Sequence, residues 1–199
     1  MVDDFLSPEM ADRISAFVAR EAEYENRYGI LDTKGGISRE EWESKDDASK
    51  LFSLSRFSKV GDRYALSPNW LSYLRFTSAS TQLELGNLWA RICTDDTADA
   101  VVTGSECLLG ALSGNQFLRY HTDKGEGAER LFCTVLYLSK NWQERDGGHL
   151  HIDAEGGEVV VVPTFNRCVV FLPGLRHAVG EFAESSTGKT RYSLTTWYT

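Results

Sequence analysis

The sequence predicts a mainly β protein of the α+β class, in which N-terminal helices support a sandwich or barrel of short strands. Helix-start signals recur through the first hundred residues, and the pattern changes character at about Val101. Eight short β-type runs follow, separated by Gly, Asn, Asp or Pro. Eight strands within about 95 residues indicate a sandwich or barrel rather than alternating βαβ units.

The chain is long enough and apolar enough for one globular domain. It has 199 residues, of which 42% are hydrophobic and 12% aromatic. It contains no internal repeat, low-complexity tract or linker. We therefore expect a single domain over 1–199, with helical support in 1–100 and the β core in 101–199.

The first helix is predicted over about 8–24. Ser7 is a suitable N-cap, and Pro8 occupies the first helical position. Four apolar residues then recur at helical spacing and predict the buried face: Met10, Ile14, Phe17 and Val18.

Three further segments carry helical signals. Ser38 precedes Glu41 by three residues, as in a capping box at the start of a helix. Ser67 followed by Pro68 repeats the Ser-Pro pair that begins the first predicted helix. The segment TQLELGNLWARIC offers a broad apolar face: Leu83, Leu85, Leu88, Trp89 and Ile92. The stretch 25–66 is expected to be irregular.

The predicted strands lie in eight runs: ECLLGALS, QFLRYH, LFCTVLYLS, GHLHID, GEVVVVPT, NRCVVFLPG, HAVGEF and TRYSLTTWYT. Because these strands need cover on one face, we expect the helices to pack outside the sheets.

Composition excludes several classes of function. The formal net charge is −8 and the basic residues are scattered, so we expect no nucleic-acid partner. The start MVDDFLSPEM does not suit a signal peptide, and no segment approaches the ~20 apolar residues that span a bilayer. We expect a cytoplasmic protein without a membrane partner; the sequence leaves its oligomeric state open. No zinc-like pairing links the cysteines, which predicts buried, reduced thiols at Cys93, Cys107, Cys133 and Cys168.

A candidate metal site lies in LRYHTDKGEG. His121 and Asp123 are two residues apart on a predicted strand, so their Cβ atoms lie on one face about 6.5–7 Å apart. A third ligand must come from another strand, and His177 begins such a strand. Two His and one carboxylate form the facial triad of non-haem Fe(II) oxygenases.

A second set of metal-ligand types lies in GGHLHID, where His149, His151 and Asp153 share a strand face. Sequence spacing alone leaves both sets open.

The last strand places Arg191, Ser193, Thr195 and Trp197 on one face. An arginine buried there without a partner would cost several kcal/mol, and a dicarboxylate co-substrate would satisfy it. The alternative is a solvent-facing arginine on an edge strand.

Six ordered pieces between about 106 and 199 resemble a known family: NQFLRYHTDK, TVLYLSKNW, DGGHLHI, PTFNRCVVF, HAV and RYSLTTWY. Together they are similar to the 2-oxoglutarate/Fe(II)-dependent oxygenases, in the prolyl-hydroxylase-like branch. The resemblance implies a double-stranded β-helix core of the jelly-roll or cupin-like kind.

The resemblance also implies roles for individual residues. His121, Asp123 and His177 match the iron ligands, whereas His149 and His151 fall where the family does not ligate metal. Arg191 matches the residue that pairs with the distal carboxylate of 2-oxoglutarate. The remaining matches are Tyr137, whose hydroxyl assists that arginine, Thr195 and Trp197 near the co-substrate and metal, and Val135 and Leu150 as apolar walls.

The implied activity is that of an Fe(II)- and 2-oxoglutarate-dependent dioxygenase. It would hydroxylate an unactivated C–H of a prolyl residue, peptide or amino-acid-like substrate and release succinate and CO2. Fe(II), 2-oxoglutarate and O2 are the implied cofactors, with ascorbate as a supporting reductant. The alternatives are a hydroxylase of a small-molecule natural-product intermediate and a non-catalytic cupin-like module that binds a metal or ligand.

Two positions depart from the family pattern. The segment EFAESSTGK lengthens the interval before Arg191, which makes Lys189 an alternative partner for the carboxylate. Ala111 stands near the place where sensing-type prolyl hydroxylases carry a tyrosine.

Residues 25–80 are candidates for a substrate lid. The side chains that would supply the cover are Trp42, Arg56, Arg63, Tyr64 and Trp70. Packing between helices is the alternative role for the aromatic residues.

Overall fold

All eight strands predicted in the second half are present. The computed structural model describes residues 1–31, 36–59, 67–93, 101–124 and 129–199. The strands are β3 Ser105–Leu112, β4 Phe117–His121, β5 Phe132–Tyr137, β6 Leu150–Ala154, β7 Gly157–Val161, β8 Cys168–Phe171, β9 His177–Val179 and β10 Arg191–Tyr198. Each begins or ends near the Gly, Asn, Asp or Pro that marked it in the sequence.

The stretch 25–66, expected to be irregular, contains two more strands, which corrects that prediction. Strand β1, Glu23–Ile30, pairs antiparallel with β2, Lys50–Lys59. The alternation in LFSLSRFS is typical of a strand, but pairing partners far along the chain decide its structure. The helix begun at Ser38 is correspondingly short, α2 Arg39–Glu43, with the Ser38 hydroxyl accepting from the Glu41 N–H at 3.1 Å.

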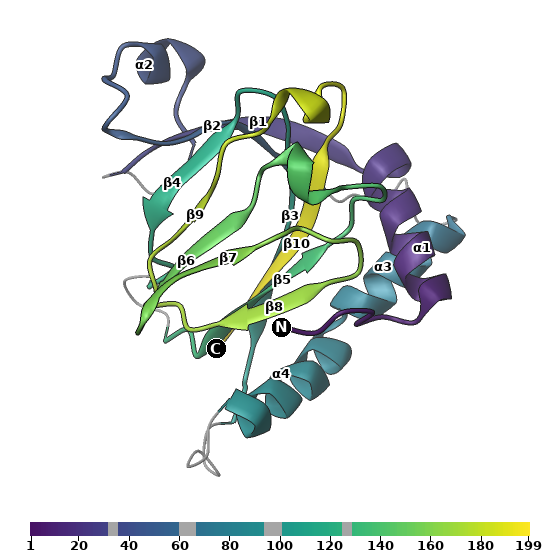
Figure 1. Ribbon diagram of the computed structural model, residues 1–199. Coiled ribbons are helices and arrows are strands. Elements are labelled where there is room, and N and C mark those ends of the chain that lie inside the picture. The colour runs from purple at the N-terminus through teal and green to yellow at the C-terminus, as the bar shows by residue number, and fades with distance from the viewer. Residues whose placement is uncertain (32–35, 60–66, 94–100, 125–128) are drawn as a thin grey trace.

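The strands form one curled antiparallel sheet in the order β7-β6-β9-β4-β2-β3-β10-β5-β8, with β1 beside β2 (Figure 1). Strand β2 thus joins the two halves of the roll. One apolar cluster lies between the halves, with Val135 and Phe171 from one side and Leu150 and Ile152 from the other. The expected double-stranded β-helix core is confirmed, and it leaves a cavity between the halves.

The first helix is shorter than predicted. Helix α1, Pro8–Ala16, continues into one π-helical turn, Phe17–Glu21, and the chain then enters β1. Pairing of Glu23 with Lys59 on β2 ends the helix three residues before the predicted boundary at 24. The N-cap and apolar face are confirmed, since the Ser7 hydroxyl accepts from the Met10 N–H and Ile14, Phe17 and Val18 are fully buried.

Helices α3, Pro68–Thr77, and α4, Ala79–Cys93, follow their predicted positions. With α1 they cover the outer face of β3, β5 and β10, as expected (Figure 1). The apolar face predicted for α4 is only partly right, because Leu88 and Ile92 are 41% and 62% exposed. The helix turns Trp89 and Ala90 to the sheet, and Gly86 allows close approach to Val102 and Tyr198.

No helix within the described ranges is long and apolar enough to cross a membrane. Cys107, Cys133 and Cys168 are free thiols; Cys133 and Cys168 are buried as expected, whereas Cys107 is only partly buried, which corrects the prediction for that residue. The side chain of Cys93 lies outside the described part of the chain.

Candidate active site

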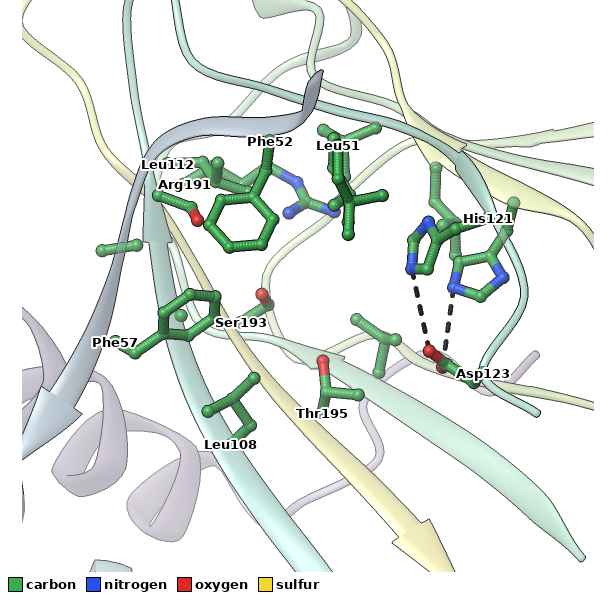
Figure 2. A pocket seen from close by; sticks show the side chains of 18 of the residues that line it. Leu51, Phe52, Phe57, Leu108, Leu112, His121, Asp123, Arg191, Ser193 and Thr195 are labelled. Carbon is green, nitrogen blue, oxygen red and sulfur yellow. Dashed lines mark ion pairs between the residues drawn. The ribbon is translucent and has the colours of Figure 1, made fainter. Parts of the chain in front are cut away.

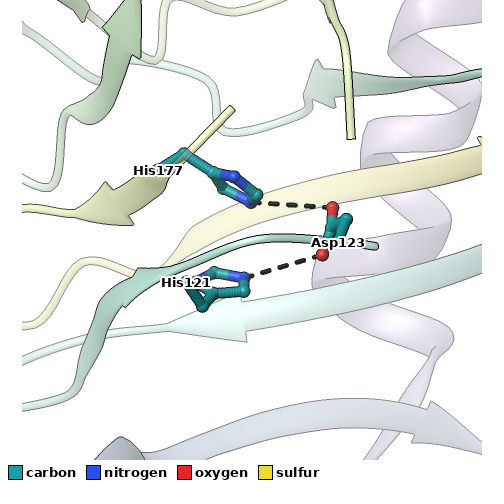
Figure 3. A group of neighbouring side chains, drawn as sticks. All are labelled: His121, Asp123 and His177. Carbon is teal, nitrogen blue, oxygen red and sulfur yellow. Dashed lines mark ion pairs between the residues drawn. The ribbon is translucent and has the colours of Figure 1, made fainter. Parts of the chain in front are cut away.

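Three side chains of metal-ligand type converge at one end of the cavity: His121, Asp123 and His177 (Figure 3). Antiparallel pairing of β4 with β9 places His121 directly opposite His177, and their ring centroids are 4.2 Å apart. Asp123 lies two residues beyond the end of β4 rather than on the strand, which corrects that prediction, and its N–H donates to the Pro173 carbonyl at 2.9 Å. One donor atom from each side chain lies within 4.8 Å of the other two, which suits a single ion.

Backbone carbonyls orient both imidazoles. Nδ1 of His121 lies 2.8 Å from the Arg119 carbonyl oxygen, and Nδ1 of His177 lies 3.0 Å from that of Leu175. Because a carbonyl can only accept, each Nδ1 carries the proton and each Nε2 presents a lone pair to the centre. The Nε2 atoms lie 3.7 and 3.6 Å from the two carboxylate oxygens of Asp123.

Burial keeps the site ready for a cation. Burial, together with the neighbouring His177, lowers the pKa of His121, so its imidazole is neutral at physiological pH. Burial also raises the pKa of the Cys133 thiol, and the nearby Asp123 carboxylate raises it further. Cys133 is therefore an uncharged neighbour of the carboxylate.

Asp123 is held both at its carboxylate and at its backbone. The Trp197 indole N–H donates to Asp123 Oδ2 at 2.7 Å, and the Arg130 guanidinium donates to the Asp123 backbone carbonyl at 3.1 Å. Arg130 also lies over the Trp197 ring, 4.4 Å from its centroid, and pairs with Glu106 at 3.2 Å. Sequence reasoning missed Arg130, whose role is visible only once β5 and β10 are paired.

The alternative metal set is not brought together. Within the described residues, the cluster of His121, Asp123 and His177 is the one group of three or more His, Cys, Asp or Glu donors with metal-like spacing. His149 contacts the Glu144 carbonyl at 2.9 Å, and His151 pairs with Glu158 at 3.2 Å.

Arg191 lies across the cavity from the His and Asp side chains (Figure 2). It is 2% exposed, and its guanidinium carbon lies 4.9 Å from the centroid of the Tyr137 ring. Neither Arg191 Nε nor the Tyr137 hydroxyl has a hydrogen-bond partner. Burial lowers the pKa of Arg191, while contact with Tyr137 acts in the opposite direction. A buried cation with an unpaired donor is the arrangement that an anionic ligand would satisfy.

Lys189, the alternative carboxylate partner, is engaged elsewhere. Its ammonium group lies 2.7 and 2.8 Å from the two carboxylate oxygens of Asp146, which is fully buried. This ion pair fixes the loop before β10, and of the two candidate carboxylate partners it is Arg191 that lines the cavity.

The cavity has a volume of about 200 Å³ and is lined mainly by apolar side chains. This is below the ~300–1,000 Å³ of sites for drug-sized ligands, so a small dicarboxylate suits it. The inward-facing residues predicted for β10 all line it: Arg191, Ser193, Thr195 and Trp197. The predicted walls Val135 and Leu150 line it as well.

Strand β2 contributes four lining residues that sequence reasoning missed: Leu51, Phe52, Ser55 and Phe57. Figure 2 labels Leu51, Phe52 and Phe57. The alternation in LFSLSRFS was the available signal, but it does not reveal that β2 lies between β4 and β3. Ala111, near the family's tyrosine position, is a lining residue too.

Trp42 and Trp70 are the aromatic lid candidates that the structure describes. Trp70 is buried among helices against Phe17 and Tyr73, and Trp42 packs on Tyr28 and donates to the Phe52 carbonyl. Trp70 is therefore a core residue, since the helices need an apolar contact face.

Of the other three lid candidates, the structure describes Arg56. Arg56 lies over the Tyr24 ring and donates to Thr190. Arg63 and Tyr64 lie outside the described residues.

Comparison with known proteins agrees with this geometry. Residues 108–199 match the model of the 2OG-Fe(II) oxygenase superfamily. A mouse protein, prolyl hydroxylase EGLN3, is 35% identical over 91 residues, which cover 43% of this chain and 36% of that protein. Its human counterpart is 34% identical over the same length. The match thus spans about a third of the length of these curated relatives.

Solved structures share the fold over almost the whole chain. A Pseudomonas putida prolyl-4-hydroxylase aligns with a TM-score of 0.66 and 22% identity, covering 99% of this chain and 89% of that one. A Trichoplax adhaerens prolyl hydroxylase, solved with a hypoxia inducible factor oxygen degradation domain peptide, aligns with a TM-score of 0.68 and 18% identity, covering 99% and 81%. The comparisons therefore agree with the resemblance: the β half of the chain is similar to the 2OG-Fe(II) oxygenase superfamily and to prolyl hydroxylases, and almost the whole chain shares its fold with prolyl hydroxylases of known structure.

Proposed function

We propose that the protein is an Fe(II)- and 2-oxoglutarate-dependent dioxygenase that hydroxylates an unactivated C–H. One observation carries the proposal: a cluster of two His and one Asp and a buried arginine without an anion face the same small cavity. The donor chemistry fits the metal, since imidazole and carboxylate suit ferrous iron, and Arg191 fits the far carboxylate of a 2-oxo diacid.

His121, Asp123 and His177 would hold the iron through their cavity-facing donor atoms. When bound, ferrous iron supplies the coupling of 2-oxoglutarate decarboxylation to hydroxylation. The balanced reaction converts 2-oxoglutarate, O2 and R–H into succinate, CO2 and R–OH. With three protein ligands, the ion would have its remaining coordination positions available to the reactants.

The remaining side chains orient the co-substrate and exclude water. Arg191 would bind the distal carboxylate, and the Tyr137 hydroxyl would add a second donor. Thr195 and Trp197 form the cavity wall between Arg191 and the metal-ligand cluster. Apolar lining from Val135 and Leu150 keeps bulk water away, which strengthens the interaction between the arginine and the anion.

The substrate class we propose is a prolyl residue in a peptide or a related amino-acid-like molecule. The mouse and human relatives are prolyl hydroxylases, and the Trichoplax enzyme was solved with a peptide. Ascorbate would act only as a supporting reductant. We propose the cytoplasm as the site of action, supported by the free thiols Cys133 and Cys168.

We also propose that residues 1–199 form one domain. Strand β2, from the first half of the chain, lies between β4 and β3 of the second half, so the two halves share one sheet. The cavity needs residues from both.

The test is succinate formation from 2-oxoglutarate with and without Fe(II), using His121→Ala and Arg191→Met. His121→Ala should abolish metal binding, with His149→Ala as the matched control. Arg191→Met should weaken 2-oxoglutarate binding at least about 30-fold, because it removes the charge partner of a buried anion. Arg13→Met, at an exposed helix position, is its control.

Substrate class is tested by mass spectrometry of proline-containing peptides and of a metabolite extract, looking for an added oxygen. Oxidation in the metabolite arm alone would replace the prolyl assignment with a natural-product hydroxylase. If the wild-type protein bound neither Fe(II) nor 2-oxoglutarate, the proposed activity would be wrong.

A further inference from the structure

Buried polar atoms without partners gather around the cavity. Among the residues that the structure describes, four buried side-chain N or O atoms have no hydrogen-bond partner. Trp89 Nε1 lies among the helices, but the other three are Ser55 Oγ, Tyr137 Oη and Arg191 Nε. Ser55 and Arg191 line the cavity, and Tyr137 lies against Arg191. Buried polar groups are nearly always paired in folded proteins, so such a concentration indicates a missing ligand.

A β-bulge directs Ser55 into the cavity. In the pairing of β1 with β2, Arg27 is opposite Ser55 and Gly29 is opposite Phe52. Between these two pairs the chain advances three residues along β2 but only two along β1. Leu54 lies within this bulge and has a positive φ of 49°. Because the bulge shifts the alternation, Phe52 before it and Ser55 after it both line the cavity.

Gln116 holds this bulge in place. It is buried, its side-chain amide donates to the Leu54 carbonyl, and its side-chain oxygen accepts from the Ser113 N–H at 2.5 Å. A β-bulge changes the direction in which a side chain points. This bulge, held by Gln116, fixes the position of the Ser55 hydroxyl, which has no hydrogen-bond partner.

The sheet register places Ser55 in line with Arg191. Strand β2 pairs Arg56 with Ala111 and Phe57 with Gly110, so the same register puts Ser55 opposite Leu112. Leu112 in turn pairs with Arg191 on β10. Residues directly opposite one another in antiparallel strands share a face, so Ser55 and Arg191 stand in one cross-strand row at the same end of the cavity.

We propose that Ser55 is a third co-substrate-binding residue, whose hydroxyl donates a hydrogen bond to the distal carboxylate of 2-oxoglutarate beside Arg191 and Tyr137. This inference rests on the function proposed above and adds a residue from outside the matched segment 108–199. A carboxylate offers about four lone-pair sites, so it accepts from a guanidinium, a phenol and a hydroxyl together. The N-terminal half thus completes the anion site.

The test measures 2-oxoglutarate binding to the full-length protein by calorimetry, with Mn(II) in place of iron so that no turnover occurs. Ser55→Ala should weaken binding about 5- to 10-fold, which corresponds to about 1–1.4 kcal/mol. Ser53→Ala is the matched control, because Ser53 lies on the same strand but does not line the cavity. Binding of oxalate, which has no distal carboxylate, should be unchanged in Ser55→Ala.

The ligand-free stability provides a second readout. Removing a buried hydroxyl that has no partner should leave the melting temperature of the ligand-free protein unchanged or raise it. A lower melting temperature would show a structural role and overturn the proposal. Unchanged 2-oxoglutarate affinity, or an equal loss for oxalate, would also overturn it while leaving the dioxygenase assignment standing. Failure of the wild-type protein to bind 2-oxoglutarate would instead overturn the proposed function.

Discussion

The indole N–H of Trp197 donates a hydrogen bond to Oδ2 of Asp123 at 2.7 Å, while Arg130 covers the indole ring. Both contacts lie outside the set of three metal-ligand side chains, yet they decide where the carboxylate points. With Oδ2 engaged, Oδ1 is the oxygen free to bind a metal. A positioned carboxylate loses less entropy on metal binding, so the contact should be measurable as metal affinity.

Trp197→Phe should therefore weaken Mn(II) binding by about 10- to 100-fold, the usual effect of removing a partner of a metal ligand. The phenyl ring keeps the apolar contact but has no N–H. Calorimetry without 2-oxoglutarate measures the effect, and Trp142→Phe is the control, because Trp142 donates to Gly147 away from the site. Equal Mn(II) affinity in Trp197→Phe and wild type would show that the hydrogen bond does not position the ligand.

Tyr137→Phe should weaken 2-oxoglutarate binding several-fold without destabilising the ligand-free protein. The hydroxyl is fully buried and unpaired, so its removal costs no hydrogen bond before the ligand arrives. Calorimetry and thermal unfolding of the same samples give both quantities. Tyr73→Phe, within the helix core, is the comparison. A variant that unfolds more easily but binds normally would contradict the assigned contact.

The strands that are flanked by turn residues were predicted from the sequence, and the strands without such flanking residues were missed. Each strand after Val101 lies between turn residues, and its apolar pattern is that of a β-strand. Strand β1 is polar and follows a helix without a stop signal, so the helical pattern appeared to run on to residue 24. Only its pairing with Lys59 and its neighbours ends the helix.

The site divides in the same way. His121 and Asp123 are neighbours in sequence, and their spacing alone suggested a metal, while His177 and Arg191 were assigned through resemblance to a family. Ser55 and Arg130 depend on strand pairing between distant segments and on a bulge at Leu54. No local pattern encodes such contacts, because they exist only after the sheet has closed.

The ion pair between Asp146 and Lys189 should make stability depend on pH. Burial of Asp146 opposes ionisation, but hydrogen bonds from Lys189 and the Gln143 N–H outweigh it and hold the pKa below the ordinary 3.8. A lowered folded-state pKa gives stability that is fully present above the unfolded-state value and is lost as pH falls through the folded-state value.

Asp146→Asn should thus lower the free energy of unfolding by about 1–3 kcal/mol at pH 7, and the difference from wild type should narrow below about pH 4. Urea unfolding at pH 7 and pH 3 measures this. Asp153→Asn, which breaks an exposed pair with Arg176, should change the value by less than about 1 kcal/mol. If Asp146→Asn lowered the free energy of unfolding by the same amount at pH 7 and pH 3, the ion pair would not be the source of the difference.

Gly147→Ala should destabilise the fold by at least about 2 kcal/mol. Gly147 has φ 72° and ψ −152°, a conformation that is essentially restricted to glycine. A Cβ there would also press on the Glu181 carbonyl and lie 2.9 Å from the Ala183 nitrogen, in the segment that leads to β10. The strain and the clash act on the same turn.

Gly188→Ala separates these two causes, because Gly188 has φ 78° but nothing within 4 Å of an added Cβ. It should cost only about 1–2 kcal/mol, the backbone part of the effect. Urea unfolding of both variants at pH 7 gives the comparison. If Gly147→Ala were no less stable than Gly188→Ala, the close contact between this turn and residues 181–183 would contribute nothing to holding the loop that precedes Arg191.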